Sequence, residues 1–175
     1  MGERGSIRRW ALPAAAMLAI AVCVVGCDGD GGRSKLTSSP APVAEIDRIE
    51  MLSLPAAVNL DNKPGPDGLR VQTYLFQVGR PQPVPVSGTL EFLLFDRKVG
   101  LGELDTVKPS RVWSFGPRDL PNYLTRSMIG WEYAMELRWD DDAPKSDTIS
   151  LAARYTAPAG RRVYSSPVVI ALGQR

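Results

Sequence analysis

The sequence predicts an all-β protein built as a single antiparallel β-sandwich, and three observations lead to this fold class. Apolar and polar residues alternate with a period of two in several short segments, as they do in strands with one buried face. Turn residues separate these segments, and the chain holds 16 glycines and 15 prolines among its 175 residues. From residue 44 onward, no segment keeps the apolar spacing of a helix for more than a turn or two.

The strands are expected in chain order between these turns. Leu69–Gln77 alternates along its length, whereas Thr89–Asp96 is apolar on both faces, as in a strand covered from both sides. The expected strands are Glu45–Leu54, Leu69–Gln77, Thr89–Asp96, Arg111–Phe115, Gly130–Trp139, Thr148–Thr156, Arg162–Ser165 and Val168–Leu172. Only Pro117–Ser127 has helical character, which Pro121 limits to a turn or two. About seven or eight strands suit an immunoglobulin-like or a transthyretin-like sandwich, and the pattern does not choose between them.

The first 26 residues have the composition of a signal peptide. Arg4, Arg8 and Arg9 form a basic start, and an apolar stretch follows from Ala11 to Val25. At about 15 residues this stretch is shorter than the roughly 20 that a membrane-spanning helix needs, and it suits the apolar region of a signal peptide. An ordinary secretory signal peptide and an uncleaved N-terminal anchor are the alternatives.

The end of this stretch resembles the lipobox of bacterial lipoproteins. The residues are Val24, Val25, Gly26 and Cys27, and the chain turns polar directly afterwards. The resemblance implies cleavage between Gly26 and Cys27, a thioether-linked diacylglycerol on Cys27, and a further acyl group such as palmitate on its new amino group. Two or three acyl chains hold a protein on a membrane essentially permanently. The expected location is therefore outside the cytoplasm, in the periplasm or at the cell surface, and which membrane carries the anchor stays open.

The residue types that are missing exclude several kinds of chemistry. The chain has no histidine, which excludes Ser-His-Asp and Cys-His catalysis and the histidine zinc sites. Its two cysteines are Cys23, which would leave with the signal peptide, and Cys27, which would carry the lipid. Neither a disulfide nor thiol chemistry is therefore expected in the mature domain. After residue 26 the chain has 18 basic and 18 acidic side chains, so its net charge gives no reason to expect nucleic-acid binding.

The mature chain divides into a tether and one folded domain. Residues 27–43 begin with the lipidated cysteine, are rich in Gly, Ser, Asp and Pro, and have little to bury, so a flexible tether is expected there. Residues 44–175 hold every expected strand and form the β-sandwich domain.

Parts of this domain resemble uncharacterised planctomycete-type envelope lipoproteins. The resemblance rests on Leu60–Val71, Gly88–Asp96, Gly130–Trp139 and Gly160–Tyr164, which include a "PG-DGL" turn and an "LFD" strand. It implies a lipobox and a tether before a single all-β domain, and it implies no assigned activity.

Two groups of acidic residues could bind a cation or act in catalysis, but both lie among residues that are typical of turns. Asp61 and Asp67 lie near glycines and are weak candidates for a calcium site completed by a distant carboxylate. The spacing after Asp61 lacks the acidic positions of an EF-hand loop, so a Pro/Gly turn between strands is favoured. Asp140–Asp142 follows a strand, and a solvated turn is favoured there over a cation site or an acid–base pair.

One face of the expected strand Gly130–Trp139 carries a row of large apolar residues that could bind sugar rings or form the core. The row consists of Trp131, Tyr133, Met135, Leu137 and Trp139. The core is favoured, because each strand of a sandwich buries one face. Trp139, at the strand end, is expected to be partly exposed, and Trp113 has the same ambiguity. A mixed, solvated surface is expected for the arginines Arg154, Arg161, Arg162 and Arg175.

These features predict a lipid-anchored, non-catalytic binding or structural module of the cell envelope. Its partner would be an envelope protein or a polysaccharide, and neither a nucleic acid, a metal nor a cofactor is expected. The alternative is a carbohydrate-binding module or a hydrolase that works with carboxylates alone. Such a hydrolase would place two carboxylates about 5–10 Å apart in a cleft, whereas a binding module would expose an apolar or edge-strand patch.

Overall fold

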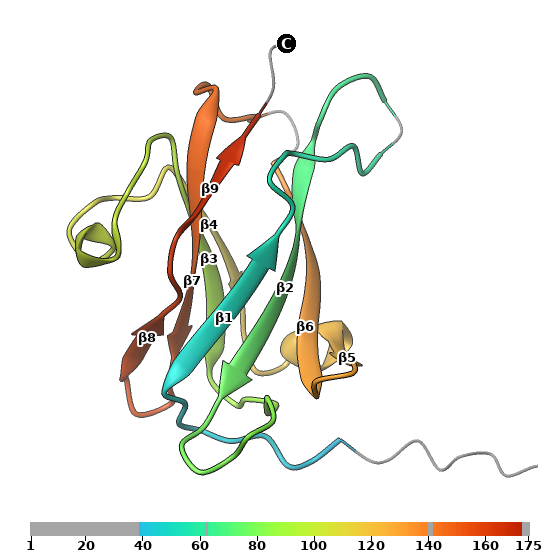
Figure 1. The fold of residues 1–175 in the computed structure, drawn as a ribbon, viewed down its shortest axis with the longest axis vertical. Coiled ribbons are helices and arrows are strands. Elements are labelled where there is room, and N and C mark those ends of the chain that lie inside the picture. Colours follow the sequence, from blue (N-terminus) through green and yellow to red (C-terminus); the bar gives the residue numbers. More distant parts are fainter. Residues whose placement is uncertain (1–38, 62, 140–141, 173–175) are drawn as a thin grey trace, which may run out of the picture. The chain divides into compact units, whose positions relative to one another are not determined.

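The computed structural model describes residues 39–61, 63–139 and 142–172. In these residues the chain forms nine strands and two short 3₁₀ helices (Figure 1). In order they are β1 (Arg48–Ser53), β2 (Gly68–Phe76), β3 (Thr89–Phe95), η1 (Leu101–Glu103), β4 (Arg111–Phe115), η2 (Leu120–Tyr123), β5 (Leu124–Arg126), β6 (Trp131–Arg138), β7 (Thr148–Thr156), β8 (Arg162–Tyr164) and β9 (Val168–Ala171). This content confirms the predicted all-β class. No helix in the described ranges is both long enough and apolar enough to cross a membrane.

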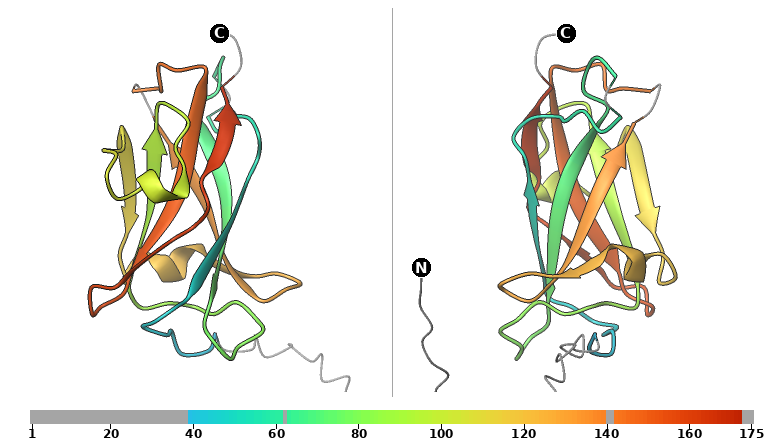
Figure 2. Two further views of the ribbon diagram at one scale, coloured as in Figure 1. Left: turned by 60° about the vertical axis from the view of Figure 1, so that its left-hand side comes forward. Right: turned by 90° about the vertical axis from the view of Figure 1, so that its right-hand side faces the viewer.

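The strands form two antiparallel sheets that enclose a common core (Figures 1 and 2). One sheet has the order β1-β2-β6-β5, and the other has the order β4-β3-β7-β8 with β9 also paired to β7. Because β8 and β9 pair with opposite halves of β7, they act as one interrupted strand. The arrangement then corresponds to strands A-B-E-D and C′-C-F-G of an immunoglobulin-like sandwich. The tertiary structure thus decides the topology that the sequence left open.

The apolar residues of the alternating strands form the core between the two sheets. Inward residues of the two sheets meet there, among them Leu69, Val71, Leu75, Leu90, Phe92, Leu94, Met135, Leu137, Leu151 and Tyr155. Strand β3 is buried on both faces, as predicted, because Leu93 and Phe95 point away from this core. They form a second cluster with Val99 and Leu104, which belong to the loop between β3 and β4.

The segment Pro117–Ser127 contains the short helical turn that was expected, together with a strand that was not. A single 3₁₀ turn forms at Leu120–Tyr123, but the next three residues form strand β5 along the edge of β6. The sequence analysis did not predict β5, because three residues are too few to show an alternating pattern and the strand depends on its pairing with β6. It also did not predict η1.

Two buried tyrosines hold the connection between β2 and β3 against both sheets. The Tyr133 hydroxyl accepts a hydrogen bond from the backbone N–H of Val86 at 2.9 Å. The Tyr155 hydroxyl accepts one from the N–H of Gly88 at 2.9 Å and donates one to the carbonyl of Ala44 at 2.7 Å. Tyr155 therefore ties two chain segments to β7 at this end of the core.

Thr73 gives a first testable prediction, because its side chain lies in the core, fully buried between Met51 and Tyr133 of the neighbouring strands. Its hydroxyl has no hydrogen-bonding partner among the described residues. A buried hydroxyl without a partner costs about 1–3 kcal/mol. We expect Thr73→Val, which keeps the branched shape, to raise the free energy of unfolding in urea by about 1 kcal/mol. A loss of stability of that size would show that the hydroxyl has a partner in solution.

Candidate binding surface

Several residues singled out from the sequence lie outside the described residues. They are Gly26 and Cys27 of the lipobox, Asp140 and Asp141 of the acidic turn, and Arg175.

The acidic candidates Asp61 and Asp67 lie in the loop between β1 and β2. Asp67 Oδ1 accepts the backbone N–H of Leu60 at 2.5 Å. Asp61 Oδ1 accepts the N–H of Lys63 at 2.9 Å, and its other oxygen lies 2.9 Å from Lys63 Nζ. These hydrogen bonds, from the Lys63 backbone first, lower the pKa of the Asp61 carboxyl. Both carboxylates therefore organise a turn, and no group of three or more Asp, Glu, His or Cys side chains that could hold a metal occurs within the described ranges.

The aromatic row on β6 belongs to the core. Tyr133 and Trp139 are 2% and 1% exposed, while Trp131 at the start of the strand is half-buried. The prediction that Trp139 would be partly exposed is wrong. The loop between β1 and β2 folds over the strand end, where Trp139 Nε1 donates to the Pro66 carbonyl at 3.3 Å. No sugar-stacking platform forms from the buried members of this row.

Trp113 on the edge strand β4 is half-buried. Its Nε1 donates to the carbonyl of Arg138 on β6 at 2.8 Å, and the guanidinium of Arg111 lies 5.6 Å from its ring centre. The hydrogen bond to Arg138 joins the two sheets, and the guanidinium lies over the ring within β4. The ring therefore serves as a bridge between β4 and β6.

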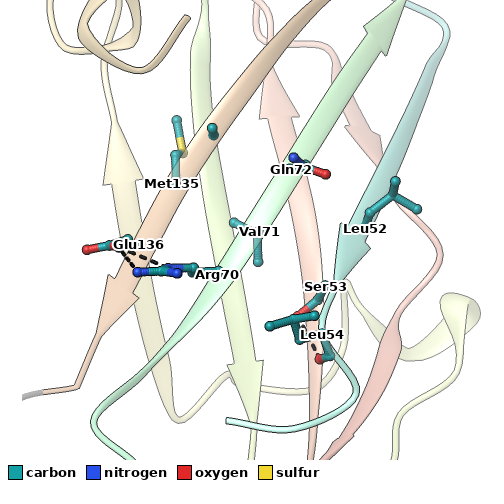
Figure 3. Close-up of a pocket in the computed structure, with 9 residues that line it drawn as sticks. Leu52, Ser53, Leu54, Arg70, Val71, Gln72, Met135 and Glu136 are labelled. Carbon is teal, nitrogen blue, oxygen red and sulfur yellow. Dashed lines mark hydrogen bonds and ion pairs between the residues drawn. The ribbon is translucent and has the colours of Figure 1, made fainter. Parts of the chain in front are cut away.

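A groove lies on the outer face of the first sheet, across β1, β2 and β6 (Figure 3). Strand pairing places Leu52, Gln72 and Ala134 side by side in one row of this face. The next row pairs Arg70 with Glu136. Because Ala134 has only a methyl group, the surface is hollow between these side chains, and the groove encloses about 520 Å³.

The apolar part of the groove lies beside strand β1. Leu52 and Leu54 are 56% and 51% exposed, although both are large aliphatic residues. Strand β1 is also the terminal strand of its sheet, so a partner at this edge would meet unpaired backbone groups. The groove thus combines exposed aliphatic side chains with a sheet edge.

The polar part of the groove is a fixed ion pair. Arg70 Nη2 lies 3.0 Å from Glu136 Oε1, and Arg138 Nη2 lies 3.2 Å from Glu136 Oε2. The hydrogen bond from Arg138, followed by that from Arg70, lowers the pKa of the Glu136 carboxyl. Glu136 therefore stays ionised at neutral pH and is suited to accept hydrogen bonds rather than to donate a proton as a general acid.

A second, smaller cavity of about 210 Å³ has two carboxylates in its lining, those of Asp96 and Asp142. The Asp142 carboxylate makes an ion pair with Arg111 at 3.0 Å and is 84% exposed. Arg111 also donates to the backbone carbonyl of Asp142 at 3.1 Å. Asp142 thus holds the loop after β6 against β4.

Two of the arginines considered in the sequence form ion pairs on the surface. Arg154 Nε lies 2.8 Å from Glu91 Oε2, and Arg161 Nη1 lies 3.5 Å from Glu45 Oε2. Their charges are therefore matched locally by carboxylates.

Of the residues that line the groove, only Met135 was singled out from the sequence, as part of the apolar row on Gly130–Trp139. Leu52, Arg70 and Glu136 are members of alternating strands, and each by itself looks like an ordinary outward-facing side chain. A usable signal would have been the pair Leu52 and Leu54, which lie two positions apart and therefore share the face of the strand opposite Ile49 and Met51. Comparison of the chain with protein-family models, curated proteins and solved structures gave no match.

Proposed function

We propose that this protein is a lipid-anchored lipoprotein of the bacterial cell envelope whose sandwich binds another envelope protein through the groove on β1, β2 and β6. The observation that carries the binding function is the groove itself, in which exposed Leu52 and Leu54 lie beside the Arg70–Glu136 ion pair. Exposed aliphatic side chains with an oriented polar pair are typical of binding surfaces. The lipid on Cys27 would hold the domain outside the cytoplasm.

A protein partner fits this groove better than a polysaccharide does. Sugar rings are usually held by stacking on exposed aromatic rings, and the residues that line the groove include no aromatic side chain. An extended protein segment could place apolar side chains against Leu52 and Leu54 and pair its backbone with the edge of β1. The partner expected here is therefore an extended segment of an envelope protein.

Site-specific photo-crosslinking in native envelopes tests this proposal. We expect a protein replaced at Leu52 by p-benzoylphenylalanine to form a discrete crosslinked product, because Leu52 lines the groove. The matched control carries the same group at Val169, which is 47% exposed on the other sheet. Introducing Arg70→Glu should remove the Leu52 product by placing two carboxylates together. Equal crosslinking from both positions, or products that consist of polysaccharide, would refute the proposed partner class.

The lipid anchor predicts a specific labelling result. In a bacterial host fed an alkyne-bearing fatty acid, we expect the wild-type protein to incorporate the label and Cys27→Ala to lose it entirely, because the thiol of Cys27 would accept the diacylglycerol. Cys23→Ala serves as the control and should keep full labelling. Label that persists in Cys27→Ala would contradict the anchor.

The second candidate function is a hydrolase or carbohydrate-binding module, and the cavity that contains Asp96 and Asp142 is the observation that favours it. In this case the protein would cleave an envelope polysaccharide, and Asp96→Asn would abolish cleavage while leaving the fold intact. The ion pair of Asp142 with Arg111 gives that carboxylate a structural role, which makes this candidate weaker than the binding function. Hydrolysis of cell-wall polymers by the purified protein would make the hydrolase the favoured function.

A further inference from the structure

One end of the sandwich gathers three segments that are far apart in the sequence. They are residues 39–47, the connection between β2 and β3, and the turn between β5 and β6 (Figures 1 and 2). We call this the tether end, because the described chain enters the domain here. Pro40 lines a small cavity together with Arg80 and Trp131, so the three segments also share a surface.

The tether end carries the two most exposed large apolar side chains among the described residues. Met128 is 103% exposed and Val78 is 78% exposed, and the neighbouring Ile129 is 54% exposed. Single exposed apolar residues are common on protein surfaces. Here, however, they lie on two loops that touch, because a Cβ added to Gly130 would lie 2.7 Å from Pro83 Cδ.

Two basic side chains of this end lie close to Trp131, and one of them, Arg80, also shares a cavity with Val78. The guanidinium of Arg126 lies 5.8 Å from the ring centre of Trp131, and Trp131 shares its cavity with Arg80. In the part of the chain that the structure describes, Arg80 makes no ion pair. The basic residues here are therefore not all offset by carboxylates, although the mature chain as a whole has equal numbers of basic and acidic side chains.

Three acidic side chains near this end have hydrogen-bonding or ion-pair partners of their own. Glu45 and Asp47 both lie within ion-pair distance of Arg161, at 3.5 and 4.0 Å. Asp119 Oδ2 accepts the backbone N–H of Gly116 at 3.0 Å. Arg80 lines a cavity together with Val78 and Asp47, so a basic side chain without an ion pair lies beside one of the exposed apolar residues.

The position of the chain entry indicates what covers this surface. Cys27 lies 12 residues before Ser39, and a chain of that length spans at most roughly 40 Å when fully extended. A lipid on Cys27 would therefore keep a bilayer within that distance of the tether end. Apolar side chains flanked by Arg and Trp are the composition of segments that lie in the membrane interface.

We propose that the tether end lies on the bilayer that holds the lipid anchor, with Val78, Met128 and Ile129 in the boundary between headgroups and acyl chains. Arg80 pairs with an anionic phospholipid headgroup. This inference rests on the proposed lipid anchor at Cys27. Its consequence is a fixed orientation, in which the loops at the other end of the sandwich point away from the membrane.

The test uses the mature lipidated protein in phospholipid vesicles, with one engineered cysteine at a time. A lipidated Cys27 has no free thiol, so Met128→Cys can be labelled selectively with the environment-sensitive dye NBD. The matched control is Lys145→Cys, an exposed position in the loop between β6 and β7 at the other end. We expect a blue shift and quenching by spin-labelled lipid for the dye at position 128, stronger in anionic than in zwitterionic vesicles, and neither effect at position 145.

The outcomes separate this inference from the anchor on which it rests. If the protein floats with the vesicles but the dye at position 128 stays in an aqueous environment, the orientation is refuted and the anchor stands. Equal quenching at positions 128 and 145 also refutes the orientation. If the protein does not float and Cys27 itself takes the dye, the anchor is refuted and this inference falls with it.

Discussion

Gly88→Ala is expected to destabilise the domain by about 3 kcal/mol, because the alanine Cβ has no space at this position. It would lie 2.3 Å from the carbonyl oxygen of Thr156 and 2.6 Å from the hydroxyl oxygen of Tyr155. Backbone atoms of β7 would have to move, and the hydroxyl that binds the Gly88 N–H would be displaced. The free energy of unfolding from urea titration measures this effect.

The control for this substitution is Gly102→Ala in η1. A Cβ at Gly102 would have no neighbour within 4 Å, and an exposed site of this kind normally changes stability by no more than about 0.5 kcal/mol. The φ of Gly88 lies outside the left-handed region, so the expected loss comes from crowding rather than from backbone strain. Similar free energies of unfolding for the two variants would show that β7 shifts and makes room for the added methyl group.

Tyr155→Phe is expected to cost about 2–4 kcal/mol, since it removes one hydroxyl and leaves two backbone groups without their partner. The lost bonds are those from the Gly88 N–H and to the Ala44 carbonyl. The ring itself is fully buried in the core and keeps its packing in the variant. Tyr164→Phe is the matched control, because the Tyr164 hydroxyl binds an exposed side chain, Asp105, at 2.5 Å. A cost for Tyr155→Phe no larger than that of the control would contradict the assigned role.

The same tyrosine predicts a loss of stability in alkaline solution. Burial first, and then the nearby Glu45 and Tyr133, raise the pKa of Tyr155 from 10.0 to about 12. Between pH 10 and pH 12 the unfolded chain therefore loses this proton while the folded domain keeps it, so the stabilising contribution is present below pH 10 and disappears as the pH rises to about 12. The expected loss is about 3 kcal/mol in all.

Tyr155→Phe supplies the internal check on this pH profile. The variant should lose the part of the alkaline slope that Tyr155 contributes, measured as the free energy of unfolding at several pH values. A smaller slope should remain, because burial raises the pKa of Tyr133 and the hydrogen bond to Glu132 raises the pKa of Tyr74. An unchanged slope in the variant would assign the alkaline loss to other groups.

The strands were predictable because their pattern is local. The expected strand Arg111–Phe115 and the expected strand Thr148–Thr156 match β4 and β7 residue for residue, and Thr89–Asp96 exceeds β3 by one residue. Strand β1 begins three residues later than expected, at Arg48. Burial of the β6 row at Tyr133, Met135 and Leu137 also followed from alternation alone. A period of two fixes the face of each side chain without any knowledge of its partners.

The failures of prediction have a common cause, which is dependence on contacts with another segment of the chain. Strand β5 exists because β6 pairs with it, and Trp139 is buried because the loop before β2 folds over it. Both contacts join residues that the local pattern treats as independent. The candidate turn Asp61–Asp67 was recognised as a turn, but its hydrogen bonds to Leu60 and Lys63 became visible only in the folded loop.

The sequence by itself determined the class of the fold, the strands other than β5 and most of the core, and it predicts the lipid anchor at Cys27. Only the tertiary structure decided the strand order, the groove and the composition of the tether end. Arg70 and Glu136 are 66 positions apart in the chain and meet because β2 and β6 pair in one register. Likewise, Val78 and Met128 share one end of the domain only because two connections fold beside each other. Alternation is a property of neighbouring residues, whereas a surface is made by the pairing of strands far apart in sequence.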